Sequence, residues 1–407
     1  MEISISRKKM IFLFAASFMA RLIFVLTLSP QGVYFDDEFE YLRMKSNFLA
    51  GNGLGLGGSL QAYRPPLYPL FITFITGFRT GFPSEIIIVR LAQVLISTFT
   101  VVLIYLIGKK VFSERIGLWA AIFSTLYPFF IFYTGFLLTE TLFIFFVALA
   151  VWETIKILDN ETVLPEKAVR AGLWYALAGL CRPTMELFFP FACAFILFGK
   201  EKFRTKILIV LLSCAVFILA LSPWIIRNYV VLKKFVPGTT MGGQVFWEGN
   251  NPYSSGGPCR YFPPGIWQVP EKDRDAAFYK ETARVIRENP ARFLWLLGNK
   301  FIRFWNIVPN AADFSSPLYR VVSVLSFGVL IPFFILGIFL NLENRKALFL
   351  VLLIAFFTIF HMVFLASIRY RVPIEPYVIL FAASGWFWIL DNMRRWKRET
   401  ISNYSGI

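Results

Sequence analysis

Apolar segments long enough, or nearly long enough, to cross a membrane recur along the whole 407-residue chain. They cover residues 10–28, 86–108, 116–134, 138–157, 168–181, 184–199, 207–225, 318–340, 347–366 and 372–391. A spanning helix needs about 20 apolar residues, so the two short segments separated by CRPT are the weakest candidates. The pattern predicts an all-α polytopic membrane protein with about ten transmembrane helices.

Composition agrees with a chain that lies mostly in lipid. Hydrophobic residues make up 57% and charged residues 16%, whereas about 25% of a soluble chain is charged. The net charge of +16 comes largely from short basic runs between apolar segments, which indicates membrane orientation rather than a nucleic-acid partner. The four cysteines show no CxxC spacing, which argues against a disulfide framework or a zinc site.

The basic runs predict which loops face the cytoplasm. They contain Arg7, Lys8, Lys9, Lys109, Lys110, Arg115, Lys167, Arg170, Lys200, Lys202, Arg204, Lys206, Arg345, Lys346, Arg394, Arg395, Lys397 and Arg398. With the N-terminus inside, every short inner loop is basic, as the positive-inside rule requires. We therefore expect a multi-pass protein of the plasma (inner) membrane, with both termini cytoplasmic and any active site on the extracytoplasmic face.

This orientation predicts three parts of the chain. Residues 1–225 form an N-terminal transmembrane module whose outward loop, 29–85, contains the Pro-rich apolar piece 65–78, expected to be re-entrant or interfacial. Residues 226–316 form a small outward-facing cap of loops and interfacial helices, and residues 317–407 form the last helices with a basic tail. The two outward segments can share one site.

The first outward loop concentrates acids in the sequence YFDDEFEY, residues 34–41. In a helix that begins near Asp37, the spacing places Asp37, Glu40 and Tyr41 on one face, and Asp36 points elsewhere. A carboxylate at a low-dielectric boundary can serve as a general base toward a hydroxyl. The alternative is that the acids only occupy the first turn of a helix, where the helix dipole favours negative charge.

Four arginines stand near predicted outer helix ends, each followed by a proline within four residues. They are Arg64, Arg182, Arg369 and Arg371. Guanidinium groups bind phosphate bidentately and remain charged when partly desolvated, so the set predicts an anionic phosphate at the membrane surface. The alternative for each is contact with lipid headgroups or pairing with Glu140, Glu186 or Glu375.

Other polar residues have more than one interpretation. Glu140, at the outer start of its helix, can orient a substrate hydroxyl, pair with an arginine, join Asp37 at a metal, or cap the helix. His361 is the only histidine, and a structural hydrogen bond is the simpler interpretation. Trp247, close to Asn250 in the cap, is a candidate for sugar stacking.

With these residues assembled, the chain resembles the membrane-embedded GT-C glycosyltransferases. It is most similar to the family-39 branch that includes protein O-mannosyltransferases and aminoarabinose transferases. The resemblance rests on DDEFEY, YRPPLYPLF with Tyr68, LLTETLF, CRPT, PWIIRNY with WEGNNP, and RYRVPIEP, in this order. Together these motifs cover most of the chain and imply a GT-C-like fold.

The resemblance also implies an activity in glycan biosynthesis of the cell envelope. A hexosyl or pentosyl group would pass with inversion from a polyprenyl-phosphate-linked donor to an acceptor hydroxyl at the extracytoplasmic face. Asp37 matches the loop aspartate that acts as base, with neighbouring Asp36 as the alternative, and the four arginines become candidates for the donor phosphate. Some distant relatives need a divalent metal, but nearer ones do not, and we expect none.

Several alternatives stay open at this point. A lipid-linked glycan polymerase or ligase would share the outward arginines but normally relies on a large later loop. A transporter or flippase of lipid-linked sugars would show related halves or broken helices at the membrane centre. The acceptor can be a lipid, a glycan or a protein.

Overall fold

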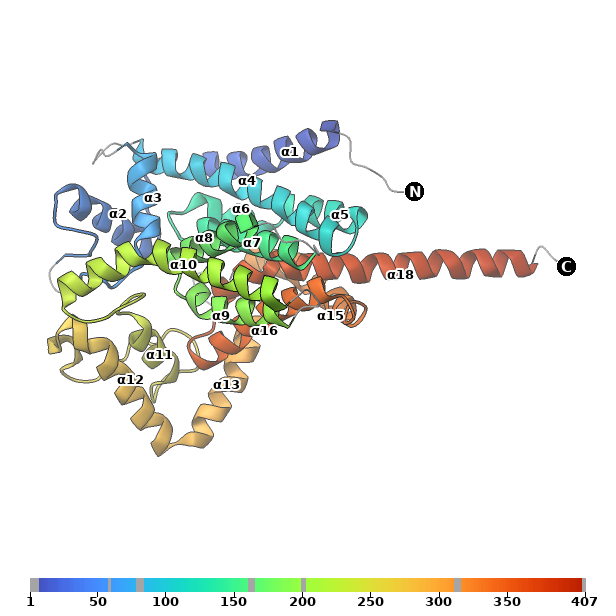
Figure 1. The fold of residues 1–407 in the computed structure, drawn as a ribbon. Coiled ribbons are helices and arrows are strands. Elements are labelled where there is room, and N and C mark those ends of the chain that lie inside the picture. The colour runs from blue at the N-terminus through green and yellow to red at the C-terminus, as the bar shows by residue number, and fades with distance from the viewer. Residues whose placement is uncertain are drawn as a thin grey trace.

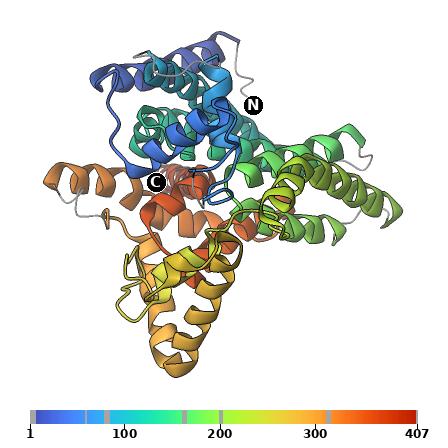
Figure 2. The same ribbon diagram turned by 90° about the vertical axis from the view of Figure 1, so that its left-hand side faces the viewer.

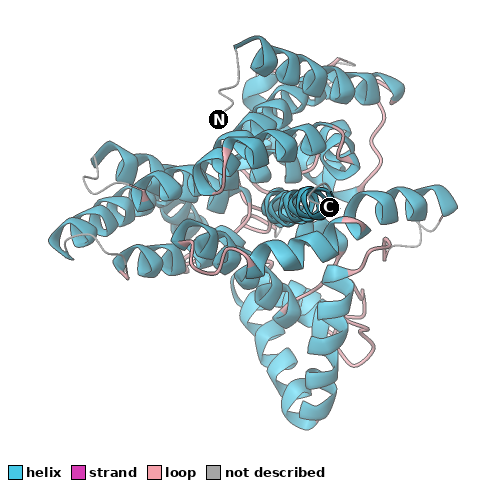
Figure 3. Cartoon of the chain, turned by 90° about the vertical axis from the view of Figure 1, so that its right-hand side faces the viewer, coloured by secondary structure: helices cyan, strands magenta, loops and turns pink. Residues whose placement is uncertain are grey.

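The computed structural model describes residues 7–57, 60–77, 84–159, 165–198, 203–310 and 316–404, with side chains as far as residue 397. Within these ranges the chain is helical, and the only β-type pairing is a single bridge between Gly57 and Leu60. Figure 3 shows helices joined by loops. The predicted all-α fold is confirmed.

The helices follow one another along the chain, most of them with short connections and with longer loops before α3 and before α12. Their bounds are α1 Arg7–Thr27, α2 Asp36–Leu49, α3 Leu67–Ile75, α4 Glu85–Val111, α5 Glu114–Thr125, α6 Pro128–Phe132, α7 Glu140–Leu158, α8 Pro165–Cys181, α9 Thr184–Leu197, α10 Phe203–Leu232, α11 Gly242–Asn250, α12 Glu271–Glu288, α13 Pro290–Trp305, α14 Pro317–Ser323, α15 Leu330–Phe339, α16 Arg345–Val363, α17 Ile368–Arg371 and α18 Glu375–Tyr404. Short 3₁₀ turns lie at Tyr133–Gly135, Ile266–Gln268 and Val372–Ile374, and Val324–Gly328 is a π-helical turn.

Each of the ten predicted apolar segments coincides with helical structure, but fewer are long enough to span a membrane alone. Among the described residues, seven helices or continuous helical runs meet the length and hydropathy of a span, and an eighth does if the bent pair Glu114–Thr125 and Pro128–Gly135 counts as one. That pair bends by 53°, because Pro128 cannot continue the hydrogen-bond ladder of α5. The protein is therefore multi-pass, and ten is an approximate count.

The long helices run in one general direction, with both termini at one end (Figure 1). Helices α2, α3, α11 and α12 gather at the opposite end. Helix α18 lies in the middle of the assembly, where Figures 2 and 3 look along it. A Cβ on Gly337 of α15 would come 1.9 Å from the carbonyl oxygen of Phe381, so this glycine permits the close approach of α15 to α18.

The two segments predicted to face outward are joined by the buried carboxylate of Glu271, at the start of α12. Its side chain accepts hydrogen bonds from the backbone N–H groups of Gln61 at 2.6 Å and Ala62 at 2.8 Å. It also accepts from the hydroxyl of Thr240 at 2.7 Å. The loop after α2 is thus fixed to the segment between α10 and α12, which brings the loop 29–85 and the predicted cap together. The three-part domain division itself stays a prediction.

Candidate active site

The first turn of α2 presents its acids in two directions. Phe35 is extended, with φ −127° and ψ 144°, and Asp36, Asp37 and Glu38 follow in the first turn, where the helix dipole favours negative charge. Glu38 turns inward and accepts hydrogen bonds from the N–H groups of Tyr34 at 2.6 Å, Phe35 at 3.0 Å and Leu137 at 2.6 Å. Glu38 therefore fixes the start of α2. Asp37, in contrast, lines a cavity.

Arg64, in the loop before α3, pairs with two of these acids. Its Nη2 donates to Oδ1 of Asp37 at 2.7 Å, and its Nε donates to Oε2 of Glu40 at 2.6 Å. The guanidinium carbon lies 5.9 Å from the ring centre of Tyr41. Asp37, Glu40 and Tyr41 therefore meet Arg64 from one face of α2, as their helical spacing predicts.

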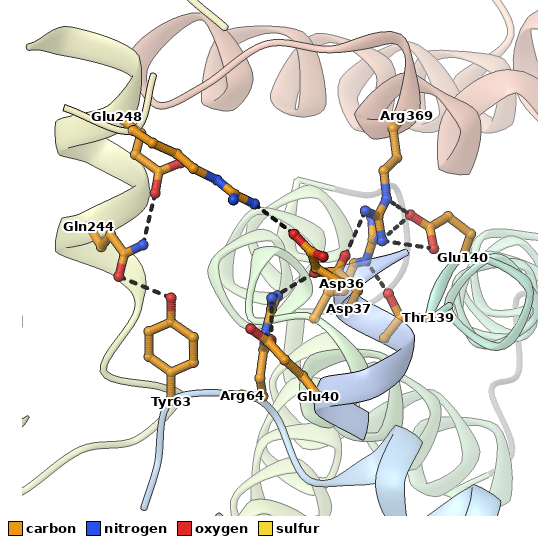
Figure 4. A network of polar contacts seen from close by, with 12 residues as sticks. Asp36, Asp37, Glu40, Tyr63, Arg64, Thr139, Glu140, Gln244, Glu248 and Arg369 are labelled. Atoms are coloured by element: carbon orange, nitrogen blue, oxygen red, sulfur yellow. Dashed lines mark hydrogen bonds and ion pairs between the residues drawn. The ribbon is translucent and has the colours of Figure 1, made fainter. Parts of the chain in front are cut away.

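Arg369 of α17 connects this group to a second carboxylate (Figure 4). Its Nη1 donates to Oδ2 of Asp37 at 2.7 Å, and its Nε and Nη2 both meet the carboxylate of Glu140, at 3.3 Å for Nη2. Arg182 pairs with the same Glu140 and donates through Nε to the hydroxyl of Thr139 at 2.8 Å. Segments separated by more than 300 residues thus meet in one network.

Charge is balanced within this network, because three arginines face three carboxylates. Burial alone would raise the pKa of Asp37, but Arg369 and Arg64 act against it and hold the pKa well below its usual range. Asp37 is therefore ionised at neutral pH, with one arginine on each of its oxygens. A ligand that draws these arginines away would make it a stronger base.

A cavity of about 670 Å³ opens against this network, a volume typical of small-molecule sites. Asp37, Arg64, Arg182 and Arg369 line it together with Tyr41. Its other lining residues include the aromatic side chains Phe143, Phe357 and Phe360 and, from the cap, Met241, Asp275 and Tyr279. The cavity therefore has a charged wall, an apolar wall and a wall contributed by the cap.

Some predicted site residues lie just behind this cavity or at its edge. Glu140 is fully buried behind its two arginines. Tyr68 is buried against Tyr41, with ring centres 4.9 Å apart, and donates its hydroxyl to Gln93 at 2.7 Å. Asp36 points outward, and its carboxylate meets Arg260 at 3.0 Å with both side chains about four-fifths exposed, at 78% and 80%.

Three other predicted residues do not line the cavity. The indole of Trp247 donates to the carbonyl of Tyr261 at 2.6 Å, and Asn250 accepts from Lys300 at 2.7 Å, so both build the cap. Arg371 is fully enclosed, paired with Glu375 at 2.8 Å. Two residues along α17 correspond to a rotation of about 200°, so Arg371 faces away from the side of Arg369.

Sequence reasoning missed Thr139 as a partner of Arg182 and Glu38 as an anchor. The helical spacing turns Glu38 away from Asp37, and this could have predicted that Glu38 fixes the start of α2 instead of lining the site. A further chain of polar contacts joins the loop to the cap: Tyr63 donates to Gln244 at 3.0 Å, and Gln244 donates to Glu248 at 2.8 Å (Figure 4). His361 makes the expected structural hydrogen bond, at 3.1 Å from the carbonyl of Leu365.

Comparisons with known proteins agree with this architecture. The model of the dolichyl-phosphate-mannose-protein mannosyltransferase family matches residues 63–226. Among solved structures, the chain is similar to the archaeal oligosaccharyltransferase AglB from Archaeoglobus fulgidus in complex with an inhibitory peptide and a dolichol-phosphate, with 14% identity and a TM-score of 0.59 over 98% of this chain and 52% of that one. It is also similar to ArnT from Cupriavidus metallidurans bound to undecaprenyl phosphate, with 12% identity and a TM-score of 0.51 over 93% and 60%.

These matches confirm the resemblance to the GT-C glycosyltransferases and the membrane-embedded helical fold that it implies. The chain spans about half the length of the AglB structures and 60% of ArnT. The search of curated proteins found no match.

One AglB structure is a complex with zinc and sulfate, so the fit of a metal to this chain's residues can be tested. Asp37 and Glu140 are the two acids that could share a metal ion at this site, and Arg369 already bridges them. Among the described residues, no group of three or more His, Cys, Asp or Glu side chains could hold an ion. In this arrangement the residues do not fit a metal centre, because a guanidinium stands between the carboxylates.

Proposed function

We propose that the protein transfers a sugar from a polyprenyl-phosphate-linked donor to an acceptor hydroxyl, with inversion and with Asp37 as general base. One observation carries this proposal: Asp37 and the three arginines Arg64, Arg182 and Arg369 line one cavity next to a cap. The family-model match over residues 63–226 and the GT-C fold support the same class of reaction.

The arginines are suited to bind the donor phosphate. Guanidinium groups bind phosphate through paired N–H donors, and three of them line this cavity. In the reaction the bond between the anomeric carbon and the phosphate oxygen breaks, and its electron pair leaves with the polyprenyl phosphate. Positive charge fixed around that oxygen stabilises the developing anion. The apolar wall at Phe143, Phe357 and Phe360 is suited to the lipid end of the donor.

Asp37 takes the proton from the acceptor hydroxyl as that oxygen bonds to the anomeric carbon. Without substrate, Arg64 and Arg369 occupy both carboxylate oxygens and make Asp37 a weak base. A donor phosphate competes for these arginines, which frees the carboxylate and raises its basicity when the donor is in place. Asp36 does not line the cavity and is largely exposed, so Asp37 is the better candidate of the two.

The acceptor would approach from the cap, where Asp275 and Tyr279 line the cavity. We place the cavity on the extracytoplasmic side of the plasma membrane and both termini in the cytoplasm. Figure 1 is consistent with this placement, because the termini lie at the end opposite α2 and α11. The acceptor remains a lipid, a glycan or a protein.

The test is transfer by the purified protein in liposomes that contain a panel of radiolabelled polyprenyl-linked sugars, with identification of the labelled product. Asp37→Asn should reduce transfer by about 10²–10⁴-fold, the range typical of a general base. Asp36→Asn is the matched control and should keep near wild-type turnover. Unchanged turnover in Asp37→Asn would remove it from the base role, and chain-length analysis of the product separates a polymerase from a single-sugar transferase.

A further inference from the structure

A second cavity, of about 870 Å³, lies among α5, the α14–α15 segment and α18. Helices α5 and α15 both pack against α18, which forms the floor between them. The lining includes Trp119 of α5 and Leu126 just after it, Val329 and Phe333 of the α14–α15 segment, and Ala383 and Trp386 of α18. We call this cavity the groove. None of its lining residues belongs to the candidate active site.

The groove is about as deep as one leaflet of a bilayer. The 12 residues of α5 correspond to a length of roughly 18 Å at 1.5 Å per residue, a little over half of a hydrocarbon layer of about 30 Å. Tyr127 and Pro128 line the far end, where the chain bends by 53° into α6. The floor contains the small residues Ala382 and Ala383, which leave room for a chain to lie along α18.

Positive charge borders the groove through two residues, Arg115 at the start of α5 and Arg394 on α18. Both lie at the end from which α18 continues toward the C-terminus, opposite Tyr127. Arg115 meets Asp391 at 3.0 Å and lies 4.0 Å from the ring centre of Phe387, so it is held at this rim. Arg394 is exposed and has neither an ion pair nor a hydrogen bond within the part of the chain that the structure describes.

We propose that the groove binds an anionic phospholipid of the leaflet next to the termini. One acyl chain lies along Trp119, Val329 and Ala383, and the phosphate is bound by Arg115 and Arg394. The arrangement fits an amphiphile because it is apolar along its length and basic only at one rim. Anionic headgroups concentrate beside basic juxtamembrane segments, and guanidinium groups bind their phosphate bidentately.

The site is distinct from that of the proposed sugar donor. The donor phosphate would lie with Arg64 and Arg369, at the end of the molecule where α2 and α11 gather (Figure 1). The groove has its cations near the termini and is bounded at Tyr127, after one leaflet depth. A lipid held here would brace α5 and α15 against α18 without entering the reaction.

Native mass spectrometry of the full-length protein, released from bilayers of equal phosphatidylglycerol and phosphatidylcholine, tests this proposal. The wild type should retain phosphatidylglycerol in preference to phosphatidylcholine. The double variant Arg115→Gln/Arg394→Gln should retain about tenfold less, because both headgroup cations are gone. Ala383→Phe should also lose the lipid by filling the floor, although both rim arginines remain.

Two matched controls separate the groove from general effects on charge or bulk. Arg395→Gln removes an exposed cation next to Arg394 that does not line the groove, and Ile218→Phe adds bulk on α10 at a position 61% exposed. Both should retain the lipid as the wild type does. Equal retention of the two phospholipids, unchanged retention in the double variant, or a retained mass equal to a polyprenyl phosphate would each overturn the proposal.

Discussion

Arg369 and Arg371 stand two residues apart in α17, yet they meet opposite surroundings. Arg369 is 29% exposed and reaches two carboxylates, Asp37 and Glu140, that belong to different segments. Arg371 and Glu375 are both 0% exposed and pair with each other. Arg371 also donates to the carbonyl oxygens of Phe304 at 3.0 Å and Asn306 at 2.7 Å.

The difference separates an ion pair that a ligand can reach from one that it cannot. Arg369 lines the cavity and shares its partners with Arg64 and Arg182, so a phosphate can replace part of its contacts. Arg371 joins α17 to the end of α13 and to the start of α18, and its guanidinium lies 3.4 Å from the ring centre of Phe327. The first arrangement suits binding, and the second stabilises the fold.

The largest effect is expected from Arg371→Ala. Removing one partner leaves the fully buried Glu375 uncompensated, which typically costs about 3–5 kcal/mol. The folded yield in detergent should fall sharply, and the unfolding temperature of the remaining protein should drop. The double variant Arg371→Met/Glu375→Leu is the control, and it should recover much of the loss because no buried charge remains. Equal loss in both variants would contradict the structural role.

Arg369→Ala should instead leave the protein folded and remove turnover. Loss of a fixed donor at a site of developing charge typically lowers the rate by about 10²–10³-fold. Arg369→Lys keeps the charge but not the fork of donors that reaches Asp37 and Glu140 together, so it should recover only part of the activity. The measurements are donor-dependent transfer rates beside unfolding temperatures. A fall in stability as large as that of Arg371→Ala would assign Arg369 to the fold.

The sequence predicts the helical fold well because hydrophobic length is the dominant constraint in a membrane. The number of spans is approximate because length alone does not decide which apolar segments cross as one straight helix. The turn at Leu126–Pro128 bends one predicted segment by 53°, and α8 and α9 have only 17 and 14 residues on either side of CRPT. A pattern of apolar residues contains no information about such bends.

The candidate site shows the same limit at the level of single residues. Helical spacing correctly groups Asp37 with Glu40 and Tyr41, because they lie within one turn and a local rule applies. The motif RYR cannot reveal which of its arginines faces a cavity, since that depends on the packing of α13 and α16 around α17. The aromatic ring of Trp247 suggests sugar stacking, but its place in the cap depends on contacts with Tyr261 and Phe278.

A smaller effect, dependent on pH, is expected at Lys300 in α13. This side chain is fully enclosed and donates to Asn250 at 2.7 Å and to the carbonyl of Val363 at 3.0 Å, and burial lowers its pKa to about 7. An unfolded lysine holds its proton up to about pH 10.4. Between pH 7 and 10 the unfolded chain therefore binds more protons, and the free energy of unfolding should rise with pH.

Lys300→Met removes this titration and tests it directly. From pH 7 to pH 9 the wild type should gain about 1–3 kcal/mol of stability that the variant lacks, at about 1.4 kcal/mol per pH unit at most. The measurement is the unfolding temperature of both proteins across that range. Parallel curves would show that Lys300 keeps its charge when folded. The folded protein would then hold a charged Lys300 without a carboxylate partner, whereas the buried Arg371 is paired with Glu375.

The smallest effect is expected from Arg260→Ala, because Arg260 and Asp36 are 80% and 78% exposed. Exposed ion pairs contribute about 0–1 kcal/mol, and salt screens them. The free energy of unfolding should therefore change by about 1 kcal/mol at most, and the rate of sugar transfer should stay within about twofold of wild type at 150 mM salt. Asp36→Asn is the matched change on the other partner and should behave alike. A much larger loss of transfer in Arg260→Ala alone could not come from this pair, and it would instead mean that Arg260 touches a substrate at the rim between α2 and the cap.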